Sequence, residues 1–315
     1  MESDAKVLSL SEIVEQQGVS DVHVQLPIHN EHTGITTDKL YGFMRMRGTL
    51  IHIPFKGDIL TDILTQKSNR RDFAYTLPSG KRLRIAVRYA NNQKMVEVFI
   101  RVLPKNIPPV FQELRSFLKP VETPSPGLFL VSGPTGSGKS TFLASLSTYY
   151  LSAMGTHMVT IEDPIEYLLP ATELGYASQR EVGVDTPDFA TGVKDALRED
   201  PDVILIGEIR DPDTAQTALT AAETGHMVLG TIHAGSCCET VERYLALIDN
   251  NTYNALRLSN TFKGSLYLTK QKDSIIYESF WNNDAIRTNI REQKTHLLEQ
   301  NRGVKAREKK EIKLS

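Results

Sequence analysis

Short stretches in which apolar and polar residues alternate dominate the first hundred residues of the chain. An opening stretch, residues 8–17, instead has the apolar spacing of a helix and stops at Gly18. The alternating stretches cover residues 22–26, 41–46, 83–89 and 95–102, and turn residues separate them. This pattern predicts a small α+β module, which we assign to residues 1–107.

The pattern changes after a proline-rich stretch. Six prolines lie from Pro104 to Pro126 around one short helical stretch, and this composition predicts a semi-rigid linker over residues 108–126. Beyond it, apolar strands alternate with helices. Strands are expected at 128–132, 158–161, 203–206 and 227–232, and helices at 139–154, 186–199 and 211–225. This alternation predicts an α/β fold over residues 127–270, with a mainly parallel sheet covered by helices on both faces.

The remaining residues, 271–315, are more polar and are expected to form a short helical C-terminal segment. Its last part, residues 301–315, carries six basic and two acidic residues. For this basic tail we expect a solvated, frayed helix, with a membrane-surface or partner-binding role as the alternative.

Composition narrows the class of protein. With 315 residues, of which 40% are hydrophobic, the chain has ample material for packed cores and is not wholly disordered. Lys+Arg 36 against Asp+Glu 38 gives a net charge of −2 and no overall attraction to nucleic acid or anionic lipid. The two cysteines, Cys237 and Cys238, are adjacent and exclude a disulfide framework or a four-cysteine zinc site. No apolar run reaches the roughly 18 residues of a membrane span, and no signal layout opens the chain, so we expect a cytoplasmic protein.

A phosphate-binding loop is predicted where the first apolar strand of the α/β part ends. The sequence matches G-x-x-x-x-G-K-[ST] at every fixed position, with a strand before it and a helix after it. Its glycines let backbone N–H groups turn toward phosphate oxygens, Lys139 adds a positive charge, and the Ser140 hydroxyl is a ligand for Mg²⁺. The expected ATP-binding residues are Gly133, Pro134, Thr135, Gly136, Ser137, Gly138, Lys139, Ser140 and Thr141.

Acidic and imidazole side chains follow the other predicted strands. Because ligands of such sheets bind at the carboxyl ends of the strands, these side chains should gather around the phosphates. Glu208 is expected in the Mg²⁺ shell together with Ser140, and His233 is expected to sense the γ-phosphate by hydrogen bonding. Glu162, Asp163 and Glu166 are candidates for activating the attacking water. Asp163, before Pro164, also suits a plain helix cap, and His226 fits no metal-ligand spacing with His233.

A phosphate site needs positive groups besides Lys139. Arg82, Arg84, Arg88 and Arg101 cluster in the late strands of the first module, and the first three share one face of a strand. They form either a solvated basic face or finger residues that reach a nucleotide across a domain or subunit boundary.

The motifs together resemble those of secretion ATPases, the hexameric motors of type IV pili and of type II and type IV secretion systems. The segments that carry the resemblance are Gly133–Thr141, Thr160–Glu166, Leu197–Glu208, and Ala221–His226 with Gly230–His233. They are similar to the Walker A, Asp-box, Walker B and His-box motifs, in family order. Within the family, the pilus retraction ATPases of twitching motility are most similar, because Ser20–His23, Arg82–Arg84, Phe99–Arg101 and Gln179–Val182 also match.

The resemblance implies a RecA-like P-loop ATPase core with an N-terminal PAS-like domain. It implies that Glu166 is the catalytic glutamate, with Glu208 and His233 in the Walker B and His-box roles. It also implies that Arg82, Arg84 and Arg101 join the site as neighbouring subunits of a homohexamer close on ATP. Arg198 and Arg210 occupy family arginine positions whose roles stay open. The partner would be an inner-membrane platform protein, contacted from the cytoplasmic face of the membrane, with no direct nucleic-acid contact.

Several features bear on the output of the motor. Residues 285–292 resemble a C-terminal element of retraction ATPases, but Thr288 and Asn289 replace its Asn-Leu, and the chain ends 23 residues later. Ala234, after His233, stands where the family usually has Thr. A conjugative or type IV secretion ATPase is therefore the alternative. Pilus extension is disfavoured, because extension ATPases generally carry a four-cysteine zinc module. Two further classes are a RecA-like nucleic-acid translocase, disfavoured by the balanced charge, and a nucleotide-binding subunit that does not hydrolyse ATP.

Overall fold

The computed structural model describes residues 7–27, 40–66, 71–92, 94–272, 274–298 and 307–313. The chain divides into two compact units, with the boundary in the sequence between Asn106 and Ile107. Each unit is described by itself. No helix among the described residues combines the length and the apolar character needed to cross a bilayer.

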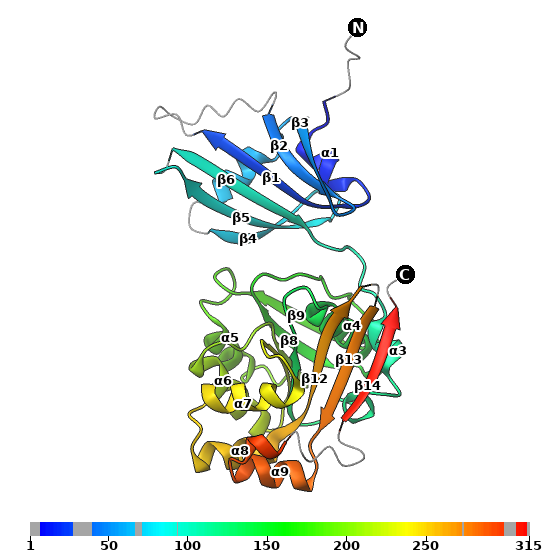
Figure 1. The fold of residues 1–315 in the computed structure, drawn as a ribbon, viewed down its shortest axis with the longest axis vertical. Coiled ribbons are helices and arrows are strands. Elements are labelled where there is room, and N and C mark those ends of the chain that lie inside the picture. The colour runs from blue at the N-terminus through cyan, green and yellow to red at the C-terminus, as the bar shows by residue number, and fades with distance from the viewer. Residues whose placement is uncertain are drawn as a thin grey trace. The chain divides into compact units, whose positions relative to one another are not determined.

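The first unit is a six-stranded antiparallel sheet with two short helices (Figure 1). Its elements are α1 (Leu10–Glu15), β1 (Val19–Pro27), β2 (Leu40–Met46), β3 (Thr49–Phe55), α2 (Leu60–Gln66), β4 (Asp72–Thr76), β5 (Arg82–Ala90) and β6 (Met95–Val102). The strand order is β3-β2-β1-β6-β5-β4. Alternate side chains of the central strands pack with α1 and α2 into one core.

The expected α+β module is present, but the sequence did not predict β3 or β4. Both are edge strands of the sheet. Along β3 only Phe55 is buried, so its sequence lacks the alternation on which strand prediction depends. The PAS-like character of this unit stays a prediction.

The second unit is built on an eight-stranded sheet with the order β14-β13-β12-β7-β11-β10-β8-β9. Six neighbouring strands of this sheet, β12, β7, β11, β10, β8 and β9, run parallel to one another. At one edge β13 pairs antiparallel with β12, and β14 pairs antiparallel with β13. The strands are β7 (Gly127–Ser132), β8 (His157–Glu162), β9 (Tyr176–Glu181), β10 (Val203–Ile206), β11 (Met227–Ile232), β12 (Phe262–Gln271), β13 (Ser274–Trp281) and β14 (Arg307–Lys313).

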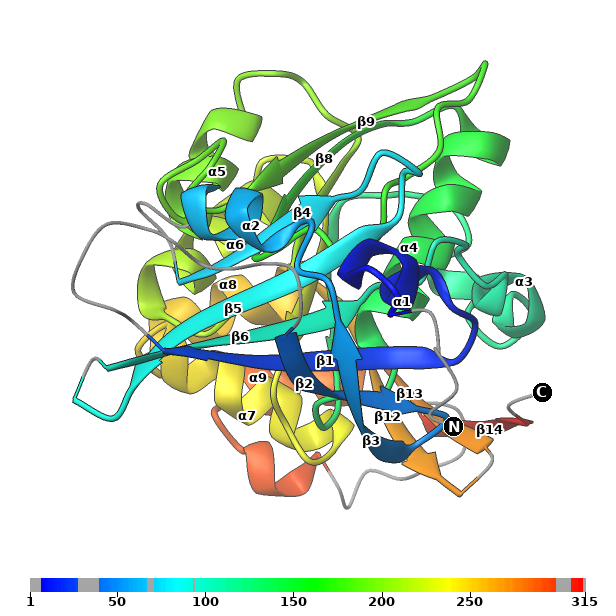
Figure 2. The same cartoon turned by 90° about the horizontal axis from the view of Figure 1, so that it is seen from above.

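Helices cover both faces of this sheet, as predicted (Figures 1 and 2). One face packs against α5 (Phe189–Ala196), α6 (Pro212–Glu223), α7 (Cys237–Leu247), α8 (Thr252–Thr261) and α9 (Asp284–Arg291). The other packs against α3 (Val110–Leu114), the 3₁₀ turn η2 (Lys119–Val121), α4 (Lys139–Tyr149) and the π-helical turn η3 (Tyr150–Met154). A further 3₁₀ turn, η4 (Thr295–Leu297), follows α9.

The stretch expected as a linker belongs to the second unit. Residues 108–126 include α3 and η2, and the side chains of Phe111, Leu114, Leu118 and Val121 are fully buried. They form one core with Phe142 and other residues of α4. Residues 108–126 therefore form a packed connection, because the apolar side chains between the prolines are buried in the core of the second unit.

The C-terminal segment is only partly helical, which corrects the expectation of a helical segment. Residues 271–315 contribute α9, η4 and the two strands β13 and β14. The basic tail is expected as a helix, yet its residues 307–313 form β14, whose backbone pairs with β13. Ile312 packs against the core from this strand, although most of its neighbours in sequence are charged. Residues 299–306 lie outside the described part of the chain.

Two further boundaries differ from the expectation. Helix α5 begins after Asp188, whose side chain accepts a hydrogen bond from the backbone of Thr191, so Asp188 is the N-cap and the helix starts later than the expected residue 186. No helix begins after Asp163, so this residue is not a helix cap.

Candidate functional site

The loop between β7 and α4 has a backbone that requires glycine. Gly133, Gly136 and Gly138 have φ angles of 142°, 76° and 98°. A Cβ atom at residue 133 would lie 2.2 Å from the carbonyl oxygen of Leu268 on β12, so a larger residue cannot fit there. The predicted phosphate loop therefore runs from a buried strand, close along β12, into the first turn of a helix.

The N-terminus of α4 is suited to bind an anion. Its N-cap, Gly138, has no side chain that could accept hydrogen bonds from the first turn of the helix. The N–H groups of a first turn have no partner within the helix, and the helix dipole adds partial positive charge there. An anion at this position would accept hydrogen bonds from these groups, as phosphates do at other helix N-termini.

Lys139 is held by the loop itself. Its Nζ donates hydrogen bonds to the carbonyl oxygens of Gly133 (2.8 Å) and Pro134 (3.0 Å). Burial lowers the pKa of Lys139, and the negative charges of Glu208 and Glu166 oppose this effect. The ammonium group therefore lies within the electrostatic range of two of the three predicted catalytic groups of this unit.

The structure brings the acidic and imidazole residues of three strand ends together. His233, after β11, places Nε2 3.3 Å from Oε1 of Glu208, which follows β10. Arg210 lies 4.0 Å from the other oxygen of Glu208 and 3.8 Å from the carboxylate of Asp163, after β8. The arrangement agrees with the expectation that these side chains share the edge at the carboxyl ends of the parallel strands.

Glu162 and Glu166 occupy different environments. Burial raises the pKa of Glu162 to about 7, although Thr160 and Gln179 donate hydrogen bonds to its carboxylate. The charge of Glu166 adds to the rise. Two carboxylates thus lie near one another, of which Glu162 faces the buried protein and Glu166 influences Lys139. The role of Glu166 at the nucleotide stays a prediction.

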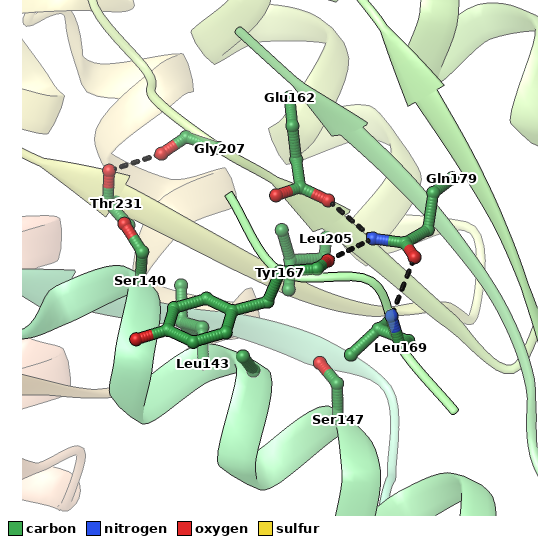
Figure 3. A pocket seen from close by; sticks show the side chains of 11 residues that line it. Ser140, Leu143, Ser147, Glu162, Tyr167, Leu169, Gln179, Leu205, Gly207 and Thr231 are labelled. Carbon is green, nitrogen blue, oxygen red and sulfur yellow. Dashed lines mark hydrogen bonds between the residues drawn. The ribbon is translucent and has the colours of Figure 1, made fainter. Parts of the chain in front are cut away.

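A small cavity of about 30 Å³ lies behind the phosphate loop, between α4 and the sheet (Figure 3). It is lined by Ser140 and Ser147 of α4, by Glu162 and Gln179, and by Thr231 of β11, among others. The hydroxyl of Ser147 is buried and has no hydrogen-bond partner in the protein, and the cavity has room for a water molecule. Polar side chains therefore line the space between α4 and the sheet as well as the phosphate loop itself.

The donor atoms near the loop fit a bound Mg²⁺. Ser140 lines the same cavity as Gly207 and Thr231, so the first turn of α4 lies against the ends of β10 and β11. Glu208 follows Gly207 directly. A hydroxyl, a carboxylate, phosphate oxygens and water make up the all-oxygen ligand set that Mg²⁺ requires.

The predicted arginines lie on β5 and β6 of the first unit, whereas the phosphate loop and the acidic residues belong to the second unit. Arg84 on β5 pairs in register with Arg101 on β6, and the Nε of Arg101 donates to Asp21 at 3.0 Å. The Nη2 atom of Arg88 donates to both carboxylate oxygens of Asp72, at 2.8 Å each. This pair favours a structural role for Arg88. A role of Arg82, Arg84 and Arg101 at a nucleotide stays a prediction.

Sequence reasoning gave no role to three groups that the structure places at the site. Arg210 lies between Glu208 and Asp163, whereas Arg198 forms an exposed pair with Asp195. Gln179 donates a hydrogen bond to the carbonyl of Tyr167, in the loop that carries Glu166, and the Tyr167 hydroxyl lies 2.8 Å from that of Thr141. The only sequence signal for Gln179 was its place in a segment similar to retraction ATPases.

The chain is similar to several known proteins. The uncharacterized protein YggR of Escherichia coli (strain K12) is 37% identical over 274 residues, which are 81% of this chain and 83% of YggR. The twitching motility protein of Neisseria gonorrhoeae is 36% identical over 256 residues, or 76% of this chain and 67% of that protein. The crystal structure of the pilus retraction motor PilT with bound ADP matches with a TM-score of 0.76 and 32% identity, over 93% of this chain and 89% of that one.

The match to PilT shows that the second unit has the RecA-like fold of these ATPases. A family model described as type II/IV secretion system protein matches residues 54–307, which is most of the chain. The chain therefore belongs to the type II/IV secretion system protein family.

Proposed function

We propose that the chain is an ATP-hydrolysing motor that powers pilus retraction within a type IV pilus or secretion machine. The observation that carries the proposal is the gathering of Glu208, His233 and Arg210 at one edge of the sheet, in the same unit as Lys139 and its loop. The similarity to a twitching motility protein and to the retraction motor PilT supports pilus retraction as the work that this motor performs.

The phosphate loop would bind the β- and γ-phosphates of ATP. The ammonium of Lys139 now bonds to two loop carbonyls, and phosphate oxygens would replace these weaker acceptors. The N–H groups of the first turn of α4 would donate to the same phosphates. Ser140 and Glu208 would hold Mg²⁺, which when bound neutralises charge that develops on the phosphates.

Glu166 would orient the attacking water and accept its proton. The water oxygen bonds to the γ-phosphorus as the bond from that phosphorus to ADP breaks, and the proton passes to the carboxylate of Glu166. His233, whose Nε2 lies 3.3 Å from Oε1 of Glu208, would donate a hydrogen bond to the γ-phosphate and so report whether it is present. Arg82, Arg84 and Arg101 would supply further positive charge, as arginine fingers do.

The larger assembly belongs to the same proposal. A homohexamer, bound to an inner-membrane platform protein at the cytoplasmic face, would convert hydrolysis into force on pilin. The family membership and the match to PilT support it.

Two measurements test the proposal. The purified chain should release phosphate from Mg·ATP, and Lys139→Ala should lose nucleotide binding while Lys263→Ala, at a half-buried lysine far along the chain, retains it. In the host, deletion of the gene should abolish pilus-dependent movement and leave pili on the surface. Loss of the pili would indicate another output, and hydrolysis that requires single-stranded DNA would indicate a translocase.

A further inference from the structure

Gln179 is a half-buried amide on the edge strand β9. It pairs in register with Thr160 of the neighbouring strand β8, and its side chain reaches toward the cavity behind the phosphate loop (Figure 3). Most polar side chains of an edge strand face water. The side chain of Gln179 instead makes its hydrogen bonds to other residues of the protein.

Both ends of the Gln179 amide bond to the loop after β8. Its Oε1 accepts a hydrogen bond from the N–H of Leu169 at 2.8 Å, and its Nε2 donates to the carbonyl of Tyr167 at 2.9 Å. The second N–H of Nε2 is directed to Oε1 of Glu162, at 3.2 Å. An amide with two donors and an acceptor all engaged has one orientation, so the main chain around Tyr167 is fixed as well.

Glu162 extends this network to Glu166. The carboxylate of Glu162 accepts the hydroxyl of Thr160 at 2.7 Å, the amide of Gln179, and a backbone hydrogen bond from Glu166. Gln179 therefore bonds to residues on both sides of Glu166 in the sequence, to Glu162 before it and to Tyr167 after it.

Tyr167 connects the same loop to the phosphate loop. Its hydroxyl lies 2.8 Å from the hydroxyl of Thr141, in the first turn of α4, and its ring is buried. The segment that carries Glu166 is thus tied to β9 by Gln179 and to the nucleotide-binding helix by Tyr167.

We propose that Gln179 is a positioning residue for ATP hydrolysis, which sets the main chain of Glu166 so that its carboxylate meets the water beside the γ-phosphate. The inference rests on the proposed function. Gln179 touches no phosphate-loop residue through a hydrogen bond that the structure shows, so it acts on the hydrolysis step and leaves the binding of nucleotide unchanged.

The test compares Gln179→Leu with a matched control, Gln216→Leu. Gln216 on α6 is also a half-buried amide with both ends engaged, since it donates to the carbonyl of Ile248 and accepts from Arg257, at 2.9 Å each. Both substitutions remove a half-buried amide from the same unit, but only Gln179 bonds to the loop of Glu166. A general loss of packing would affect the two variants alike.

For each variant, titration with ADP gives the number of nucleotide-binding sites and the affinity for ADP. Phosphate release from ATP, divided by that number of sites, gives kcat per site, and its dependence on ATP concentration gives KM. Gln179→Leu should lower kcat per site by about tenfold or more, because small displacements of a catalytic group are costly. Its KM and its affinity for ADP should stay within about twofold of wild type, as should every value of Gln216→Leu. Equal kcat per site in the two variants, or a loss of ADP affinity in Gln179→Leu, would overturn the inference.

Gln179→Glu provides a second variant of the same shape, in case the leucine variant does not fold. It keeps the acceptor for Leu169 and loses both donors, so the same fall in kcat per site is expected. An unchanged kcat would again overturn the inference. A wild-type chain that binds ADP and releases no phosphate would contradict the proposed function, whereas equal rates in wild type and both Gln179 variants would contradict the positioning role alone.

Discussion

The Nε2 atom of His233 lies 3.3 Å from Oε1 of Glu208, and this contact joins the ends of two adjacent parallel strands, β11 and β10. The side chains of both residues are partly open to solvent. A group that binds beside Glu208 would therefore be in reach of the histidine. His233 therefore lies next to Glu208, the proposed Mg²⁺ ligand, and we expect it to affect the nucleotide from this position.

We expect His233→Ala to lower kcat for ATP hydrolysis by about 100-fold, the size of effect that a single positioned donor can have. Affinity for ADP, which lacks the γ-phosphate, should change little. The control is His226→Ala, at the opposite end of β11, where the ring lies within hydrogen-bond distance of Thr224 and of the carbonyl of Ala221 on α6. Phosphate release and ADP binding measure both variants. Equal rates in the two would contradict a role of His233 at the site.

Glu166→Gln should separate binding from hydrolysis. The amide is as large as the carboxylate but cannot accept the proton of the attacking water, so kcat should fall by about 1,000-fold. ATP should still bind, because the phosphate loop is unchanged. Glu173→Gln, an exposed site further along the same connection, is the control and should hydrolyse ATP at the wild-type rate. Similar rates for Glu166→Gln and wild type would remove Glu166 from the mechanism.

The sequence predicted the centre of the second unit well and its edges poorly. Strands β7, β10 and β11 are wholly buried, so each is a continuous apolar run bounded by turn residues. Strand β9 reads Tyr-Ala-Ser-Gln-Arg-Glu, and β14 is mostly charged. Both lie at the edges of the sheet, where backbone pairing alone can hold a polar strand.

The candidate site shows the same division. Glycines of a phosphate loop and acids after apolar strands are visible in sequence, because their position relative to strands is a local property. The role of Gln179 depends on backbone atoms of Tyr167 and Leu169, ten or more residues away. The contacts of Arg210 with Asp163 and Glu208 likewise depend on which strands are neighbours. Only the folded chain provides that information.

The packing of Phe111 tests whether residues 108–126 belong to the second unit. Phe111 is fully buried, with ring centroids 5.0 Å from Tyr149 and 6.5 Å from Phe142. We expect Phe111→Ala to lower the free energy of unfolding of this unit by about 3–5 kcal/mol, through lost burial and a cavity. Gln112→Ala, at the exposed neighbour, should change it by less than about 0.5 kcal/mol. Urea unfolding measures both, and an unaffected Phe111 variant would support a free linker.

The buried carboxyl of Glu162 predicts a dependence of stability on pH. Its pKa rises from 4.5 to about 7 in the folded chain, chiefly through burial. Between these values the folded chain holds a proton that the unfolded chain has released, so the free energy of unfolding falls as the pH rises. The shift corresponds to a loss of about 3 kcal/mol once the pH exceeds 7.

Glu162→Gln removes this titration, so the variant should gain stability relative to wild type as the pH increases. Urea unfolding at pH 5 and pH 8 measures the change in the difference between the two proteins. Glu173→Gln, which replaces an exposed carboxylate, should keep the pH dependence of the wild-type chain. If Glu162→Gln keeps it as well, Glu162 is ionised in the folded chain at pH 5, and burial does not hold its proton.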